Sequence, residues 1–473
     1  MRILLVTHRF PPRHRAGTEL YTAELARRLC ALGDEVHVAT AEKDVSRPDL
    51  TWTTREFEGL PVHELTQNLL HQDFRETWDH PVVNERFGEL LERLQPDVVH
   101  AQHLLYLGVG VMERARALGA ATAMTCHDFW FECPRLGQLV HADGGLCESV
   151  DFQRCGSCLP SYPWSQPAGA AGAARLIAGV RRVTGVNLGG VAERWNRRVR
   201  GKRGVEDGPV TVPGPEETAS FAALAAERSD ELRERLSASV QRFFSPSRFL
   251  RDRLVRWGIP AERVEHVPTG VEPSAPLGDS APQNVAGGPV EVLFLGSFVP
   301  LKGAHVLVDA WSRLGAGVRE RARLRLHGPA EHAPGYARDL ARRAAACGAE
   351  LGSPLDRDGV ATAIARADLL VVPRLWFENR PLVILEAFAA GKPVLVSDLG
   401  GAAELVEPGR TGWRFPAGDA PALAGLLSGL IDDPASIPRR VSPDPAELPD
   451  WSVPVARMRA VYEQLRGEGS PSA

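Results

Sequence analysis

The most constraining feature of this sequence is a strand–helix alternation that runs through the chain twice. The first series opens with the apolar strand-like run 2–7, an amphipathic stretch at 17–32 that stops at Gly33, and a second strand at 35–40. The second series opens with the apolar run VEVLFLGS at 290–297. Because strands that alternate with helices form parallel sheets covered on both faces, the pattern predicts an α/β protein with two Rossmann-like, doubly wound domains.

Both series continue in the same way. The first continues with a strand at 95–102, a helix near 108–118 and a strand at 121–128. The second continues with helices at 303–314 and 335–347, strands at 323–328 and 367–373, a helix after Pro381 and a strand at 393–398. The series predict a first domain at 1–272 and a second at 290–448. Residues 273–289 are rich in proline, glycine, serine and alanine, which is the composition of a linker.

The first domain carries an irregular insertion at 160–240. Its segment 175–203 holds nine basic residues against one acid, Glu193. This segment is interpreted either as a solvated basic insertion or as a contact for anionic lipid headgroups or a phosphorylated acceptor. A charged amphipathic helix at 216–244 is expected to end the insertion.

The charge and hydropathy of the chain exclude several classes of protein. Lys and Arg total 55 against 59 Asp and Glu, a net charge of −4, so we predict no nucleic-acid partner. The first apolar run ends at Arg9, too early for a secretory segment, and no run approaches the ~18–20 apolar residues of a membrane span. We therefore expect a cytoplasmic protein, with 175–203 as the candidate for peripheral contact with the inner face of a membrane.

Ligands of open α/β sheets bind beyond the carboxyl ends of the strands, so the loops that leave those ends are the candidates for function. They are 8–19 and 125–130 in the first domain, and 296–303, 327–335, 374–381 and 397–404 in the second. Pro381 suits a first helical turn, so the helix after it is expected to begin at 380–382. Its free amides and positive dipole end would suit a phosphate.

Four side chains in these loops could carry chemistry, and each also has an ordinary structural explanation. Glu378 and Glu386 flank the helix start, where an acid is also a favourable dipole partner. Lys302, which precedes a glycine, could bind a diphosphate or be a surface lysine. His127 could face a ligand or cap the end of a strand.

On these residues the sequence resembles the retaining, nucleotide-sugar-dependent glycosyltransferases of family 4, which have the GT-B architecture. Glu378 and Glu386 match that family's two glutamates separated by seven residues, and the resemblance covers most of the chain. It implies a hexosyltransferase that moves a hexose from a nucleoside-diphosphate sugar to a hydroxyl of a carbohydrate, lipid-linked or small-molecule acceptor, with retention of configuration. Cell-surface polysaccharide, glycolipid or natural-product glycosylation is the implied setting.

The resemblance also implies a role for each matching residue. Glu386 would hydrogen-bond the ribose of the donor nucleotide, and Glu378 would contact hydroxyls of the donor sugar. The amides of Leu382 and Val383 would bind the diphosphate. Lys302 would neutralise the leaving diphosphate, where negative charge builds as the glycosidic bond breaks.

Further implied roles fall on the first domain and on the end of the chain. His127 would touch the donor sugar, Gly17 would pack against the phosphates, and the backbone near Gly328 would contact the base of the nucleotide. The first domain would be the acceptor side. The segment 449–466 would be a helix that crosses back onto it, and 467–473 would be disordered.

The sequence departs from the family at two positions. The family usually has an arginine five residues before the lysine, where this chain has Ser297, and it more often has Gly-Gly where this chain has Ala16-Gly17. One cation on the diphosphate is thus missing from its usual place. The candidates to replace it are Arg374, Arg380, Arg13 and Arg15, and the sequence does not choose among them.

A metal-binding DxD motif in a cleft loop is not evident. Asp356 and Asp358 have the letters, but they follow a Gly-Ser-Pro turn and are more simply read as a helix N-cap. The resemblance then implies catalysis without a metal cofactor, in which cations and helix dipoles do the work of Mg²⁺. Front-face attack through an oxocarbenium-like ion pair is the implied route, because no nucleophile for a double displacement is evident.

The segment 133–158 contains four cysteines with the spacing C-x13-C-x7-C-x2-C, namely Cys133, Cys147, Cys155 and Cys158. Four thiolates ending in a C-x-x-C pair fit a structural zinc that orders a long loop, as in a cysteine-bearing subset of the family. The first two spacings are wider than in common zinc ribbons, so reduced thiols are an equal interpretation and redox regulation a third. Cys30, Cys126 and Cys347 are expected to pack in cores.

Three alternative functions are open at this point. A non-hydrolysing sugar-nucleotide epimerase has the same double-sheet plan. A catalytically silent nucleotide-binding protein is the second alternative, and Ser297 is the feature that keeps it open. An NAD enzyme is disfavoured because the first strand–helix turn lacks GxGxxG, and GVGVME at 108–113 has no third glycine.

Overall fold

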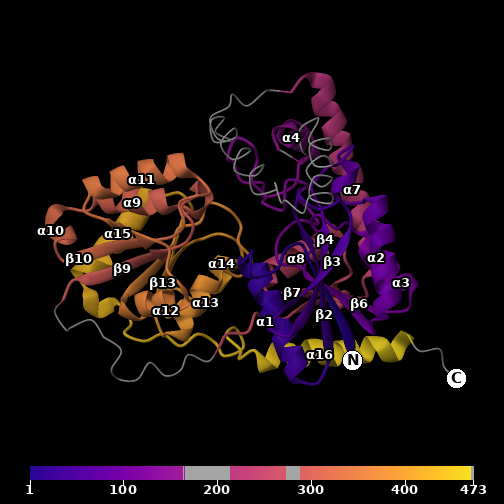
Figure 1. The fold of residues 1–473 in the computed structure, drawn as a ribbon. Coiled ribbons are helices and arrows are strands. Elements are labelled where there is room, and N and C mark those ends of the chain that lie inside the picture. Colours follow the sequence, from indigo (N-terminus) through magenta and orange to yellow (C-terminus); the bar gives the residue numbers. More distant parts are fainter. Residues whose placement is uncertain (163, 166–212, 273–287, 470–473) are drawn as a thin grey trace. The chain divides into compact units, whose positions relative to one another are not determined.

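The computed structural model describes residues 1–162, 164–165, 213–272 and 288–469, and the chain forms two compact units (Figure 1). Unit 1 comprises 1–245, 253–265 and 455–473, and unit 2 comprises 246–252 and 266–454. The basic segment 175–203 and most of the predicted linker, 273–287, lie outside the described residues. Both units are α/β structures, as the strand–helix alternation predicts.

Unit 1 is built on an eight-stranded sheet in the order β3-β4-β2-β1-β5-β6-β7-β8. Its strands are β1 (Arg2–Thr7), β2 (Glu35–Glu42), β3 (Trp52–Phe57), β4 (Leu60–Thr66), β5 (Val98–Ala101), β6 (Ala121–Thr125), β7 (Arg242–Ser245) and β8 (Val264–His266). At its centre, Ile3 of β1 pairs in parallel with Val36 on one side and Val98 on the other. Such a strand is buried on both faces, which is why its sequence is a continuous apolar run.

The helices that accompany this sheet are α1 (Gly17–Ala31), α2 (Pro81–Leu94), α3 (Gly110–Ala117), α4 (Phe152–Cys158), α7 (Pro215–Ser239), α8 (Arg248–Trp257) and α16 (Ser452–Gly469). Among them α1 packs against β1 and β2, α3 packs against β5 and β6, and α4 packs against α7. In α16, Tyr462 is fully buried and its hydroxyl is paired with His100 Nδ1 of β5. Arg459 of the same helix lies 2.9 Å from Asp34. Helix α16 therefore packs into the core of unit 1.

Unit 2 is built on a six-stranded parallel sheet in the order β11-β10-β9-β12-β13-β14. Its strands are β9 (Val290–Leu295), β10 (Ala322–His327), β11 (Glu350–Gly352), β12 (Leu369–Val372), β13 (Val394–Ser397) and β14 (Gly412–Phe415). Its helices are α9 (Ala304–Arg313), α10 (Ala316–Arg319), α11 (Pro334–Ala346), α12 (Arg357–Arg366), α13 (Leu382–Ala389), α14 (Gly400–Glu404) and α15 (Ala420–Asp432). Phe294 and Leu295, neighbours on β9, belong to different core clusters, so both faces of the sheet are covered.

The sequence missed some features of this fold. The hairpin of β3 and β4 is antiparallel and turns at Glu58-Gly59, both with positive φ, although its alternating residues and glycine turn are recognisable signals. Cys30 is exposed rather than in a core. The expectation of disorder from 467 was wrong for 467–469, which continue α16, and 470–473 lie outside the described residues. Within the described part of the chain, the helices are too short or too polar to cross a membrane.

Candidate active site

At the carboxyl edge of the sheet in unit 2, two loops bring a lysine, an arginine and a glutamate together. Lys302 ends a short 3-10 turn after β9, and Gly303 follows it with φ +71°. A Cβ on Gly303 would lie 1.6 Å from the carbonyl oxygen of Pro373, which follows β12. Only glycine permits both this backbone angle and this close approach. The glycine thus holds Lys302 against the loop that carries Arg374 and Glu378.

Glu378 is the centre of this cluster. Its Oε1 is paired with Lys302 Nζ and accepts a hydrogen bond of 3.0 Å from Trp376 Nε1. Its Oε2 lies 3.2 Å from Arg374 Nε. The ammonium of Lys302 also lies 5.0 Å from the centre of the Trp376 ring, within the range of a cation–π contact. One carboxylate is therefore the shared partner of two cations, and the cluster has a net positive charge.

Burial and mutual attraction set the protonation states of the cluster. Burial raises the pKa of Glu378, but the charges of Arg374 and Lys302 outweigh it and bring the pKa to about 2. Burial and the nearby Arg374 lower the pKa of Lys302, against the attraction of Glu378. Burial likewise lowers the pKa of Arg374. Both cations are thus held partly out of water beside a single carboxylate, and a second anion would be favourable there.

Glu378 should make the stability of the chain depend on pH in the acid range. Because its folded pKa of about 2 lies below its ordinary 4.5, its stabilisation is complete above pH 4.5 and is lost as the pH falls toward 2. The shift corresponds to about 3 kcal/mol. We expect Glu378→Gln to flatten the fall of the unfolding free energy across this window, measured by urea unfolding in small pH steps. Glu386→Gln is the control, because burial raises the pKa of Glu386; equal slopes in the two variants would contradict this account.

The structure distinguishes the candidate replacements for the cation missing at Ser297. A Cβ added to Gly296, the residue before Ser297, would lie 3.1 Å from Arg374 Nη1. That Nη1 is buried and has no hydrogen-bond partner among the described residues. The guanidinium of Arg380 is instead paired with Glu447, and that of Arg13 lies 3.4 Å from Glu42 in unit 1. Of the two candidates in unit 2, Arg374 is therefore the one that reaches the place beside Ser297.

The other predicted donor-binding residues of unit 2 lie around the same edge. Leu382 and Val383 form the first turn of α13, where helix amides lack partners within the helix. Glu386 lies one turn later in the same helix. Packing requires a glycine at position 328, because a Cβ on Gly328 would lie 1.9 Å from the carbonyl oxygen of Gly296. Close packing of two loops is thus sufficient to explain this glycine.

Asp356 is the N-cap of helix α12. Its side chain accepts a hydrogen bond of 2.8 Å from the amide of Gly359 at the start of α12. The prediction that the pair of aspartates at 356 and 358 marks a helix start is confirmed.

In unit 1, several histidines lie at the carboxyl edge of the sheet. His127 follows β6, lies 3.0 Å from Gln102 Oε1 through its Nε2, and packs edge-on against Tyr21. Burial, followed by the nearby His103, lowers the pKa of His127 to about 3. His127 is thus a neutral imidazole at neutral pH, suited to hydrogen bonding rather than to carrying charge. Gly17 opens α1, is exposed and has open space around its Cβ position.

Two histidines of this edge, His8 and His103, were missed from the sequence. The ring of His8, after β1, lies 4.4 Å from that of His103, after β5, and His8 Nε2 lies 3.6 Å from the buried Glu19. Because the amide of Leu105 donates to His103 Nδ1, Nε2 of His103 carries the proton and donates to Asp128 at 2.9 Å. The sequence signal that could have identified them is the position of each histidine just after a strand, because these strands are adjacent in one sheet.

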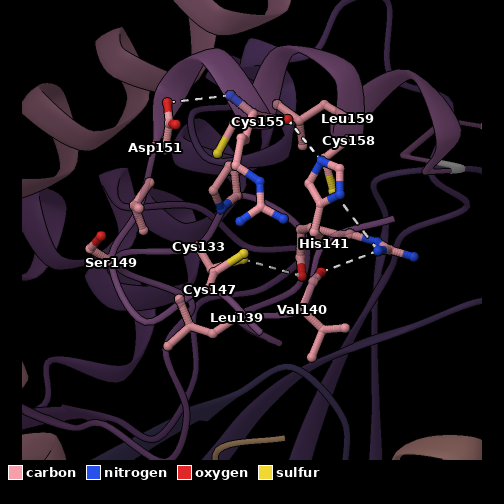
Figure 2. Close-up of a pocket in the computed structure, with 14 residues that line it drawn as sticks. Cys133, Leu139, Val140, His141, Cys147, Ser149, Asp151, Cys155, Cys158 and Leu159 are labelled. Atoms are coloured by element: carbon pink, nitrogen blue, oxygen red, sulfur yellow. Dashed lines mark hydrogen bonds between the residues drawn. The ribbon is translucent and has the colours of Figure 1, made fainter. Parts of the chain in front are cut away.

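The four cysteines of the 133–158 segment line one pocket with His141 (Figure 2). The pocket has room for about 20 Å³, roughly the space of one water or ion. A tetrahedral zinc with four sulfur ligands needs sulfur atoms about 3.8 Å apart, whereas no three of these sulfur atoms lie within 4.8 Å of one another. Burial raises the pKa of Cys133 to about 11 and that of Cys155 to about 12. A zinc bound by all four sulfur atoms would need the loop to close around the ion.

Zinc at these cysteines stays a prediction, and metal analysis tests it. We expect these cysteines to hold about one zinc in the chain purified without chelators, because four thiolates bind this ion strongly. Cys155→Ser should lower the zinc content and the thermal stability together. Cys30→Ser, at an exposed cysteine outside the loop, is the control and should change neither. A zinc-free wild-type chain would instead identify the four residues as reduced thiols.

Comparisons with known proteins give the following likenesses. The family "Glycosyltransferase Family 4" matches residues 15–146, and "Glycosyl transferases group 1" matches residues 289–433. A phosphatidyl-myo-inositol mannosyltransferase of Mycobacterium leprae is 33% identical over 236 residues, 46% of this chain and 58% of that protein. A glycogen synthase of Mycobacterium tuberculosis is 30% identical over 188 residues, 39% of this chain and 45% of that one. The chain thus spans about half the length of the curated relatives it matches.

Two solved structures have a similar fold. HepE of Anabaena, in complex with UDP and glucose, matches with a TM-score of 0.59 at 14% identity, over 98% of this chain and 99% of that one. Sucrose-phosphate synthase of Thermosynechococcus elongatus matches with a TM-score of 0.62 at 18% identity, over 99% of each chain. At these identities the likeness concerns the fold, and the predicted GT-B class is confirmed.

Proposed function

We propose, because this chain carries glycosyltransferase domains in both of its halves, that it transfers a hexose from a nucleoside-diphosphate sugar to an acceptor hydroxyl with retention of configuration. The observation that carries the proposal is the cluster of Lys302 and Arg374 on Glu378. It lies at the carboxyl edge of the sheet in unit 2, where open α/β sheets bind their ligands. The UDP complex of a protein with the same fold supports the class of donor.

The charge of this cluster fits a diphosphate. Two cations share one carboxylate, and Arg374 Nη1 has no hydrogen-bond partner within the described part of the chain. Lys302 is about one quarter exposed (24%), so its ammonium is accessible to a ligand. A diphosphate would supply the second anion and accept hydrogen bonds from both side chains. The first-turn amides of α13 would add donors from the same edge.

The loop that carries Glu378 is held in place by its neighbours. The amide of Gly401 in α14 donates to the carbonyl oxygen of Glu378 at 2.9 Å, and a Cβ on Gly401 would lie 1.9 Å from the carbonyl oxygen of Asn379. The side chain of Asn379 is hydrogen-bonded to Ser247. A loop fixed at these points keeps the Glu378 carboxylate in one position, as a group that orients a sugar hydroxyl requires.

The proposed reaction depends on stabilising the leaving group. As the bond from the anomeric carbon to the phosphate oxygen breaks, negative charge grows on the diphosphate, and Lys302 and Arg374 would neutralise it without a catalytic metal. The acceptor hydroxyl would attack from the face that the diphosphate leaves, and the leaving oxygen would take its proton. Glu378 would hold the hydroxyls of the donor sugar, Glu386 the ribose, and His127 of unit 1 would act as a neutral hydrogen-bonding group.

A panel of nucleotide sugars tests the proposal. The full chain is incubated with UDP-, GDP- and ADP-sugars and a set of carbohydrate, lipid-linked and small-molecule acceptors, and release of the nucleoside diphosphate is followed. We expect one donor class to be consumed only when an acceptor is present, and NMR of the product to show the anomeric configuration of the donor. Conversion of the donor into a sugar isomer without an acceptor, or binding without turnover across the panel, would contradict the proposal.

A further inference from the structure

Unit 1 contains a cluster of two histidines and a glutamate that none of the roles above uses. His71, Glu76 and His80 lie on the connection between β4 and α2, and one ligand atom from each lies within 4.8 Å of the other two. His71 Nδ1 is 3.9 Å and His80 Nε2 is 3.8 Å from the same atom, Glu76 Oε2. These distances are too long for direct hydrogen bonds. The three groups therefore face a common point without bonding to one another.

The buried nitrogen of this cluster lacks a partner. The side chain of His71 is only 2% exposed, and its Nδ1 has no hydrogen-bond partner among the described residues. A buried polar atom without a partner costs about 1–3 kcal/mol and calls for an explanation. An ion between His71 Nδ1 and the Glu76 carboxylate would satisfy both groups.

We propose that His71, Glu76 and His80 bind a divalent transition-metal ion, zinc first among them. Two imidazole nitrogens with one carboxylate oxygen form a donor set that zinc favours, whereas magnesium and calcium favour oxygen ligands alone. Zinc ligands of this kind are about 3.4 Å apart, so the separations of 3.8 and 3.9 Å from Glu76 Oε2 need to contract by a few tenths of an ångström. The two histidine nitrogens, which lie within 4.8 Å of each other, need to approach each other as well. The fourth position is left to water or to a ligand from outside the chain.

The backbone around the three residues is fixed. Glu76 Oε2 accepts a hydrogen bond of 2.7 Å from the amide of Gln72, which orients the carboxylate. The carbonyl oxygen of His71 accepts one of 2.8 Å from the hydroxyl of Ser165. His80 is the N-cap of α2, but its ring makes no capping hydrogen bond, and its Nδ1 has no hydrogen-bond partner among the described residues.

The segment between these residues is anchored to the rest of unit 1. Trp78 is fully buried, its indole donates to Glu231 of α7, and its carbonyl oxygen accepts from the amide of Val109 at 2.8 Å. Arg75 pairs with Glu227 and Glu231 on the same helix. The ligands are thus presented by a rigid turn, which lowers the entropic cost of binding an ion.

Cobalt titration tests this site in the full-length, metal-stripped chain. Co²⁺ bound by nitrogen and oxygen gives ligand-field absorption without the sulfur-to-cobalt charge-transfer band that cysteine thiolates produce. The spectrum therefore distinguishes cobalt at this site from cobalt in the cysteine pocket. Zinc competition then gives the affinity. Glu76→Gln keeps the shape of the side chain and its acceptor oxygen while removing the charge. We expect it to weaken this binding at least about 10-fold.

His332→Gln, at an exposed histidine of unit 2, is the matched control and should leave the titration unchanged. His80→Gln is the second variant, so a poorly folding Glu76→Gln chain would not leave the test open. Circular dichroism without metal checks that each variant is folded. A wild-type chain without the nitrogen and oxygen signal, or a signal that persists unchanged in both site variants, would overturn the proposal. Because the readout is metal binding, its failure would not bear on sugar transfer.

Discussion

Replacing Lys302 with alanine is expected to lower the rate of sugar transfer about 10²–10³-fold, because removing one group that stabilises developing charge typically has an effect of this size. The ammonium is paired with Glu378 in the free chain, and we expect it to turn to the diphosphate as negative charge grows there. The loss should therefore appear mainly in kcat. The measurement is the initial rate of diphosphate release with the donor that the panel identifies.

Lys392→Ala is the matched control for this variant. Lys392 lies two residues before β13, at the amino edge of the same sheet and away from the strand ends that carry Lys302. Burial also lowers the pKa of Lys392, as it does that of Lys302. A Lys302→Ala chain that is folded and as active as the control would place the diphosphate elsewhere.

Arg374→Met is expected to lower transfer by about 10²-fold, because the chain would lose the second cation on the leaving group. Arg374 is buried and ion-paired, so part of any loss could come from a disturbed Glu378 rather than from the diphosphate. The split between KM and kcat and the thermal stability of the variant are therefore measured together.

A second substitution separates these two explanations. Ser297→Arg in the Arg374→Met chain returns a cation to the position where the resembling family usually has it. If Arg374 acts on the diphosphate, we expect the double variant to recover at least about 10-fold of the lost rate. If Arg374 only supports Glu378, the added arginine restores nothing, and failure of the rescue in a folded chain would refute the assignment.

Much of the site in unit 2 could be predicted because it follows from one geometric rule. Lys302 and Glu378 are 76 residues apart in the chain, yet each lies in a loop that leaves the carboxyl end of a parallel strand, and such loops share one edge of the sheet. The apolar runs of β9 and β12 made those strands recognisable. Pro381 placed the start of α13 correctly, since it is the N-cap of that helix.

The choice of Arg374 over Arg380 could not be predicted in this way. Both arginines are buried and lie in the same loop. The hydrophobic periodicity and the composition of the sequence therefore do not distinguish one from the other. What separates them is Glu447, which pairs with Arg380 from 67 residues away, and Gly296, whose missing side chain leaves room for Arg374. Long-range pairings of this kind depend on packing that local patterns do not encode.

The histidines of unit 1 show a similar limit. The sequence selected His127 but not His8 or His103, because a lone histidine after a strand is not distinctive. Their closeness arises from the strand order, in which β1, β5 and β6 are adjacent. The order of strands in a sheet is the part of the topology that the alternation alone leaves open.

The way the chain divides between its units has a consequence for work with fragments. Residues 246–252 belong to unit 2 although the chain then returns to unit 1 before continuing at 266. From this short segment the amides of Arg248 and Phe249 donate to Glu404. A recombinant piece cut at the linker would lack these contacts and expose the surface they cover. Separately expressed halves should therefore be poorly soluble, and nucleotide-binding experiments need the uncut polypeptide.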